Sequence, residues 1–382
     1  MTRFVPVFTT SLFLSLHLGT ILYVNSSLLN KFFDPSAISL LFILGALGNI
    51  ALFLSAPKLI ERLGKRVLLL FLLILAALST IGLSLATTKP TVAAFFIIYA
   101  SLLYMIFYCL DIFLEEISVD TKTGEIRSAY IALIHLGLIL GLSTLTLLVV
   151  DNVLKPVYIT AALLLVPPIL LAIFSLKSPT PNWHGLHHHH ASLPLKSWWL
   201  AKNVRRATMA RLALELFYAF MTIYTPLYLY SILGFNWTII GIMFIIMLLP
   251  FILIQWPAGK LADYFIGEKE MMIVGFLIMG TTLLFMPYLE ASVIFWTIVL
   301  FFSRVGAALV EITSDSYFFK HVSPYDTRLL SIFRLTRPAG IIFGAGLGAL
   351  SLSFFSFDKI FFVLAIIIFF GLKESLLIRD TL

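Results

Sequence analysis

The chain has 382 residues, of which 60% are hydrophobic and only 12% are charged. A soluble globular protein carries about twice that share of charge, so the composition excludes an ordinary soluble domain and indicates a polytopic membrane protein. The net charge of +7 does not require nucleic acid as a partner, because in membrane proteins Lys and Arg mark the cytoplasmic side. The single Cys109 excludes an internal disulfide and is expected to pack rather than react.

Long apolar runs recur along the whole chain, in two sets of six. Each has about 20 residues, the length that crosses a bilayer as a helix, so we predict an all-α membrane protein with twelve transmembrane helices. The first run follows Arg3 directly and exceeds the core of a signal peptide, so it is expected to remain as a span. The expected spans are 4–28, 37–57, 67–87, 91–116, 128–150 and 154–176, then 207–232, 236–257, 271–288, 291–319, 329–354 and 358–378.

The polar stretch between the two sets divides the chain. It contains several prolines, five of the eight histidines and a group of basic residues, which is typical of a linker. We therefore expect an N-terminal six-helix bundle at 1–176, a cytoplasmic linker at 177–206 and a C-terminal six-helix bundle at 207–382. Neighbouring histidines in a flexible segment can hold zinc or nickel weakly, but they do not define a metal site, and we expect none.

The distribution of basic residues predicts the orientation in the membrane. If both termini are cytoplasmic, the inner segments contain 18 Lys and Arg, and the outer loops contain four, which are Lys31, Lys89, Lys155 and Lys359. This bias favours cytoplasmic termini, because inner loops are enriched in Lys and Arg. We expect a multi-pass protein of the cytoplasmic, or inner, membrane.

The two halves of the chain resemble each other at an offset close to 200 residues. The matched pairs are Asp111 with Glu311, Glu115 with Asp315, Gly137 with Gly340 and Gly141 with Gly344. Because the matches keep their order at nearly one offset, we predict two parallel repeats related by an axis along the membrane normal.

A short loop motif precedes the third span and returns before the ninth. The first copy reads PKLIERLGKR at 57–66, and the second reads GKLADYFIGEK at 259–269. The motif residues are Glu61, Arg62, Gly64 and Lys65 in the first copy, and Gly259, Asp263 and Gly267 in the second. Two six-span halves, a central linker and this motif resemble the major facilitator superfamily. The resemblance implies two bundles that give alternating access to a central cavity lined by spans one, four, seven and ten.

Spans four and ten each carry one polar stripe. The stripe of span four consists of Tyr104, Tyr108, Asp111 and Glu115 at helical spacing. The corresponding positions of span ten are Arg304, Ala308, Glu311 and Asp315. A charge inside the bilayer is costly, so both stripes are expected to face protein or a wet cavity rather than lipid.

Two roles are open for the four acids, which lie near the predicted cytoplasmic ends of these spans. As a cytoplasmic gate, Asp111, Glu115, Glu311 and Asp315 would form ion pairs, with Arg334 and Arg337 among the partners. As proton carriers they would titrate during transport, because crowded carboxylates in a poorly solvated place favour their neutral forms. The roles overlap, since a gate opened by protonation would couple protons to transport.

Substrate contacts are predicted on the same stripes. Arg304 lies near the middle of span ten and suits an anionic substrate. The alternative is a structural ion pair between Arg304 and an acid. Tyr104 and Tyr108 share the acid stripe of span four, which distinguishes them from the many aromatics expected in the core or against lipid. We predict that these three residues bind substrate.

Two further ionisable residues are candidate proton carriers beside Glu311. Glu215 follows Arg211 by four residues on span seven, so the pair can either satisfy itself or couple protons. His17 lies midway along span one, where a cavity histidine could bind substrate or take a proton. The alternative for His17 is a buried ring that hydrogen-bonds a carbonyl.

The sequence predicts a secondary active transporter, driven by a proton gradient and without a cofactor. It contains no phosphate-binding loop, nucleophile constellation or zinc motif, so neither an enzyme nor an ATP-driven pump is expected. The expected partners are a small-molecule substrate and the lipid bilayer, and the chain is expected to act as a monomer. Efflux of small amphipathic compounds and uptake of an anionic or organic solute both remain open. The alternative is a receptor or scaffold that keeps the fold without transporting.

Overall fold

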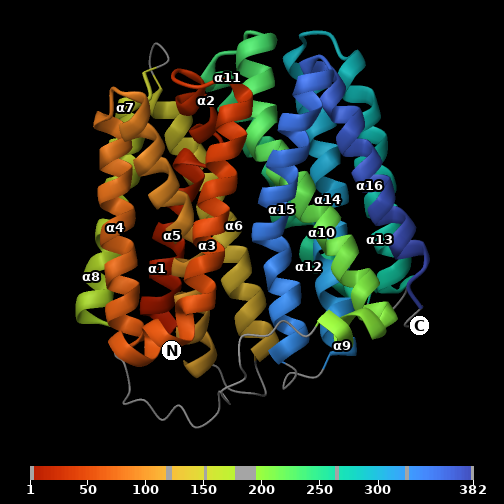
Figure 1. Cartoon of the computed structure of the whole chain (residues 1–382). Helices are drawn as coiled ribbons and strands as arrows, with labels where there is room; N and C mark the ends of the chain where they lie inside the picture. Colours follow the sequence, from red (N-terminus) through yellow and green to blue (C-terminus); the bar gives the residue numbers. More distant parts are fainter. Residues whose placement is uncertain are drawn as a thin grey trace. The chain divides into compact units, whose positions relative to one another are not determined.

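The computed structural model describes residues 4–117, 123–149, 153–176, 195–262, 266–322 and 327–379. Within these ranges the chain is helical, with short turns between helices and no strand (Figure 1). Ten helical segments of this part are long and apolar enough to cross a membrane, and Trp237–Leu253 is a shorter apolar helix. The chain is therefore a multi-pass membrane protein.

The chain divides into two compact units. The first comprises Met1–Ala191 with Asn236–Gly241, and the second comprises Ser192–Phe235 with Ile242–Leu382. The helices up to the division are α1 (Phe4–Ile21), α2 (Asn25–Asn30), α3 (Pro35–Leu63), α4 (Lys65–Leu85), α5 (Lys89–Ile117), α6 (Thr123–Leu148), α7 (Lys155–Leu163) and α8 (Val166–Phe174). The later helices are α9 (Leu195–Leu200), α10 (Lys202–Leu227), α11 (Trp237–Leu253), α12 (Gln255–Leu261), α13 (Glu268–Phe285), α14 (Val293–His321), α15 (Thr327–Phe354) and α16 (Ile360–Leu376).

Several expected spans are interrupted or end in short irregular turns. The span expected at 154–176 is broken into α7 and α8, and Pro167 lies in the first turn of α8. Proline is tolerated there because the first turn of a helix leaves its N–H groups unpaired anyway. In the second unit, α10 contains Pro226 and continues into a π-helical turn at Tyr228–Ile232. Short 3-10 turns at Met286–Tyr288 and Phe357–Lys359 follow α13 and precede α16.

The two units have corresponding helix contacts. In the first, α1 packs on α5, α6 and α7, and in the second, α10 packs on α14, α15 and α16. Glycines allow close approaches in both units: a Cβ on Gly137 would lie 2.6 Å from Ser15 Cβ, and a Cβ on Gly340 would lie 2.5 Å from Glu215 Cβ. These contacts make Ser15 and Glu215 equivalent, at the offset of 200 residues found in the sequence.

The loop motif marks a helix junction in both units. Gly64 ends α3 with φ 76°, and Gly267 precedes α13 with φ 94°. Residues other than glycine rarely adopt such positive φ angles, so glycine allows the backbone to turn at these two positions. Glu61 and Arg62 belong to the last turn of α3 rather than to a loop, because the helix continues as far as Leu63.

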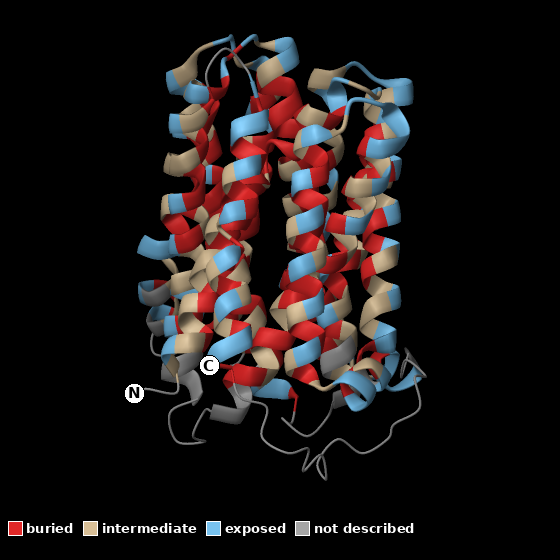
Figure 2. Ribbon diagram, turned by 90° about the vertical axis from the view of Figure 1, so that its left-hand side faces the viewer, coloured by how far each residue is buried: buried red, intermediate tan, exposed pale blue. Residues whose placement is uncertain are grey.

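Burial follows the membrane-protein pattern within each unit. Buried side chains gather where helices of one unit face one another, and exposed ones follow the outer faces (Figure 2). The outer face of α4 exposes Val67, Phe71 and Leu78, which suits contact with acyl chains. Cys109 is fully buried in the core between α4 and α5, as its expected packing role requires.

Candidate functional site

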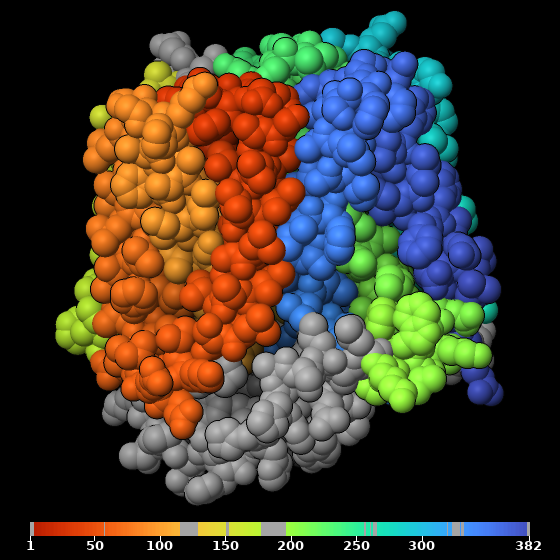
Figure 3. Space-filling model, in the orientation of Figure 1, coloured from red at the N-terminus to blue at the C-terminus, as the bar shows by residue number. Residues whose placement is uncertain are grey.

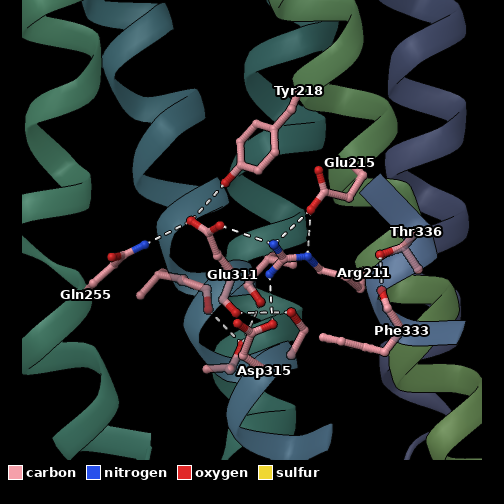
Figure 4. Close-up of polar contacts among 12 residues, drawn as sticks. Arg211, Glu215, Tyr218, Gln255, Glu311, Asp315, Phe333 and Thr336 are labelled. Atoms are coloured by element: carbon pink, nitrogen blue, oxygen red, sulfur yellow. Dashed lines mark hydrogen bonds and ion pairs between the residues drawn. The ribbon is translucent and has the colours of Figure 1, made fainter. Parts of the chain in front are cut away.

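A single arginine holds three carboxylates together in the second unit (Figure 4). Arg211 Nε donates to Glu215 Oε1 at 2.9 Å, and its Nη1 donates to Asp315 Oδ1 at 2.9 Å. Its Nη2 donates to Glu311 Oε1 at 3.3 Å. One guanidinium on α10 therefore bridges its own helix to two acids of α14.

Glu311 accepts hydrogen bonds from two other side chains besides Arg211. Its Oε2 accepts a hydrogen bond from the Tyr218 hydroxyl at 3.2 Å and another from Gln255 Nε2 at 2.9 Å. Together with Arg211 this gives three donors from two helices, α10 and α12, converging on one side chain of α14 (Figure 4). Arg211 and Tyr218 can both donate to Glu311 because they lie, together with Glu215, on one face of α10.

The cluster is largely removed from solvent. The side-chain exposure is 4% for Glu215, 12% for Arg211, 21% for Glu311 and 37% for Asp315. The described contacts thus gather three carboxylates around one guanidinium in a place where charge is poorly solvated.

Arg304 lies deeper in α14 and has a different environment. It is 1% exposed, eleven residues after the start of the helix, or about 16 Å along it. Its guanidinium carbon lies 4.8 Å from the centre of the Phe217 ring and 5.5 Å from that of Tyr218. Its Nε is buried without a hydrogen-bond partner, and no carboxylate of the described ranges forms an ion pair with it. The structural alternative, pairing with an acid, is therefore not realised within those ranges.

His17 is a fully buried member of a neutral network in the first unit. Its Nδ1 lies 2.8 Å from the Ala161 carbonyl oxygen, and its Nε2 lies 3.0 Å from the Tyr99 hydroxyl. Because a carbonyl only accepts, Nδ1 donates, and Nε2 of the neutral ring accepts from Tyr99. His17 thus joins α1 to α7 and α5, and this geometry supports the carbonyl-bonded alternative.

The polar stripe of α5 is only partly described. Tyr104, Tyr108 and Asp111 are half-buried, and the Tyr108 ring packs edge-on against Phe53 at 5.4 Å between centroids. The Glu115 side chain lies outside the described residues. The predicted substrate and gate roles of this stripe remain predictions.

The predicted gate also remains a prediction. Glu311 and Asp315 meet Arg211, while Arg334 and Arg337, the partners expected from the sequence, are exposed on α15. The sequence predicted Glu215, four residues on along the same helix, as one partner of Arg211. The structure adds the contacts across to α14.

The comparisons with known proteins concern both the sequence and the fold. Residues 217–378 match the sequence profile described as Major Facilitator Superfamily. The whole fold resembles the crystal structure of a point mutant of the nucleoside transporter NupG, with a TM-score of 0.81 and 13% identity, over 98% of this chain and 99% of that one. A second crystal structure of nucleoside transporter NupG gives a TM-score of 0.76 and 15% identity, over 99% of both chains. Among curated proteins, none matches the sequence significantly.

The predicted resemblance to the major facilitator superfamily is confirmed. The profile covers the part of the chain that includes Arg304, Glu311 and Asp315, and the fold match covers nearly all of it. At 13–15% identity the match to solved structures shows a shared fold alone.

The motif residues of the superfamily fold are placed at the helix junctions described above. Lys65, the first residue of α4, is buried, and its Nζ lies 4.7 Å from the centre of the Phe113 ring. Gly259 lies in α12, where an added Cβ would come within 3.7 Å of Ile312. Asp263 lies outside the described residues. These contacts tie the motif to α5 in the first unit and to α14 in the second.

A metal site does not emerge from the described part of the chain. It contains no group of three or more His, Cys, Asp or Glu suited to hold a metal ion. The histidine run at 184–190 lies outside the described residues.

Sequence reasoning missed the partners of His17. Tyr99 and Ala161 are 82 and 144 residues away along the chain, and Tyr99 lies off the polar stripe of its helix. A second buried bond, from the Tyr158 hydroxyl to Asn25 Oδ1 at 2.7 Å, was missed for the same reason. Uniformly apolar helices give no periodic signal for single polar contacts, so only a three-dimensional structure reveals them.

Proposed function

We propose that the chain is a secondary active transporter that moves a small molecule across the cytoplasmic membrane by alternating access, coupled to protons. The proposal includes twelve spans with both termini in the cytoplasm. The observation that supports the transport function is Arg304, whose buried guanidinium has no ion-pair partner in the described ranges.

A fixed cation without a counterion is costly inside a membrane. It is useful to a protein that must bind an anionic group there, because the ligand then supplies the missing charge. Phe217 and Tyr218 stabilise the guanidinium through their ring faces and leave its N–H groups available. A guanidinium binds carboxylate or phosphate groups through paired hydrogen bonds, so the substrate is proposed to carry such a group.

The Arg211 cluster supports the proposed coupling to protons. It brings three carboxylates to one guanidinium, and a carboxylate is a group that can take up and release a proton. Tyr218 connects the two sites, since its ring lies against Arg304 and its hydroxyl donates to Glu311.

The other parts of the proposal follow from this mechanism. The proton gradient supplies the energy, so no cofactor is required. The protein acts on its substrate by moving it rather than by converting it, and it does so as a monomer within the bilayer, without nucleic acid.

Substrate binding can be tested through thermal stability. The purified chain is screened against sugars, organic acids, phosphorylated compounds, peptides and drugs, with nucleosides added because the structural neighbours are described as nucleoside transporters. A binder at a hundred times its dissociation constant stabilises by about 2.7 kcal/mol.

The Arg304→Ala variant is the decisive comparison. We expect it to lose the stabilisation by an anionic hit, while the control Lys359→Ala, an exposed residue of the same unit, keeps it. Equal stabilisation of wild type and Arg304→Ala would remove Arg304 from the site. Absence of any hit would favour the receptor or scaffold alternative.

The coupling is tested by Glu215→Gln in vesicles loaded with the compound that the screen identifies. The amide cannot release a proton, so we expect exchange of the compound across the membrane to persist while accumulation driven by a pH gradient stops. Accumulation at the wild-type level would show that Glu215 does not carry the coupled proton.

A further inference from the structure

The short helix α9 has two different faces. Trp198 is 8% exposed and packs with Val204, Phe318 and Phe333 in a small core at the ends of α14 and α15. Trp199 and Leu200, in contrast, are 61% and 70% exposed. Figure 3 shows the surface of α9 and the residues that follow it, in light green, at one edge of the second unit. The inward tryptophan fixes the helix to the unit and leaves the outward pair uncovered.

Four basic residues lie within six positions of the exposed pair along the chain. Lys196 and Lys202 are exposed, and Arg205 and Arg206 are half-buried. The sequence has no acidic residue from 177 to 214, and no carboxylate of the described ranges pairs with any of these four side chains. The surface therefore combines uncompensated positive charge with an exposed indole.

The arginines are held in place by contacts with the backbone and with the indole. Arg205 Nη1 donates to the Trp199 carbonyl oxygen at 2.6 Å, and its guanidinium carbon lies 4.4 Å from the Trp199 ring centre. Arg206 Nη1 donates to the Leu377 carbonyl oxygen at the end of α16. These bonds use one donor of each guanidinium, and a planar guanidinium has further N–H groups for an anion.

We propose that α9 and the basic residues beside it form a binding site for the headgroup of an anionic phospholipid. Trp199 and Leu200 would lie among the headgroups and the first methylenes, where tryptophan is favoured. Lys196, Lys202, Arg205 and Arg206 would bind the phosphate and any further negative charge of the headgroup. The lipid is the occupant rather than a soluble anion, because the exposed indole and Leu200 need apolar cover beside the charges.

Lipid retention on the full-length chain provides the first test. The protein is titrated in detergent with phosphatidylglycerol or phosphatidylcholine, and bound lipid is counted by native mass spectrometry. Each lysine near an anionic surface contributes about fivefold in affinity, so Lys196→Gln/Lys202→Gln should bind phosphatidylglycerol roughly 25-fold more weakly. The control Lys89→Gln/Lys359→Gln changes two exposed lysines elsewhere and should bind as the wild type does.

Brominated lipids provide a second measurement that does not depend on the lysines. Brominated phosphatidylglycerol should quench the tryptophan fluorescence of the wild type more than that of Trp199→Phe, and the difference should shrink with brominated phosphatidylcholine. Glycerol phosphate at millimolar concentration should not displace the lipid.

Three results would overturn the proposal. The first is equal retention of the two lipids by the wild type. The second is an equal loss of affinity in the two lysine variants. The third is displacement by glycerol phosphate, which would identify a site for soluble anions instead.

Discussion

The two units of the chain have equivalent helix contacts, but the side chains at these contacts differ in polarity and charge. At the offset of 200 residues, Ser11 and Ser15 of α1 correspond to Arg211 and Glu215 of α10. The two serine side chains are buried, and neither Oγ has a hydrogen-bond partner within the described ranges. Their counterparts form the centre of the ionic cluster. The two repeats thus keep the same close helix contact, while the side chains at that contact are neutral in one unit and charged in the other.

The difference indicates a division of roles between the units. The first contains a neutral network around His17, in which each ring nitrogen has a partner. The second contains Arg211, which pairs with three acids, and the buried Arg304, with which no acid of the described ranges pairs. Under the proposed function, the second unit carries the charge changes of transport, and the first supplies a fixed scaffold.

The largest expected contrast between the units comes from removing the central arginine. Arg211→Met leaves the carboxylates of Glu215, Glu311 and Asp315 without this cation, and breaking a buried ionic group typically costs about 3–5 kcal/mol. Ser11→Ala, the matched change in the first unit, removes an unpaired hydroxyl and should be nearly neutral. Thermal unfolding in detergent measures both. Similar midpoints for the two variants would mean that the cluster does not stabilise the second unit.

Adding one methyl group to equivalent glycines sharpens the comparison. Gly340→Ala would press on Glu215, and Gly137→Ala on Ser15, so each should destabilise by about 1–3 kcal/mol. Only Gly340→Ala should also change the infrared absorption of protonated carboxyl groups, because it displaces an acid of the cluster. An unchanged spectrum would indicate that the position of Glu215 does not control protonation.

The smallest expected effects come from removing two tyrosine hydroxyls, one in each unit. Tyr99→Phe leaves His17 Nε2 without a donor in a fully buried place, at a cost of about 1–3 kcal/mol. Tyr218→Phe should cost about 1 kcal/mol or less, because Glu311 keeps Gln255 and Arg211 as donors. Unfolding midpoints test the order, and a reversed order would show that the Tyr218 bond contributes more than its geometry indicates.

Much of the fold follows from the sequence, because hydropathy and length specify membrane helices almost without reference to tertiary contacts. The repeat was visible in the acids of α5 and α14 and in the matched glycines. The site was predicted less completely. Helical spacing shows that Arg211 and Glu215 share a face, but it does not show which helix packs opposite them. The bridge from Arg211 to Asp315 spans 104 residues of chain and depends on how α10 meets α14.

The burial of Cys109 has a practical consequence for watching the protein move. It is the only cysteine of the chain, and its thiol is enclosed by the core of the first unit. Thiol-reactive probes should therefore not react with the native protein and should label only cysteines that are introduced by mutation. Pairs of spin labels or fluorophores, one in each unit, would then test the proposed alternating access, which requires the distance between them to change. The wild-type sequence is already a suitable background for such spectroscopy.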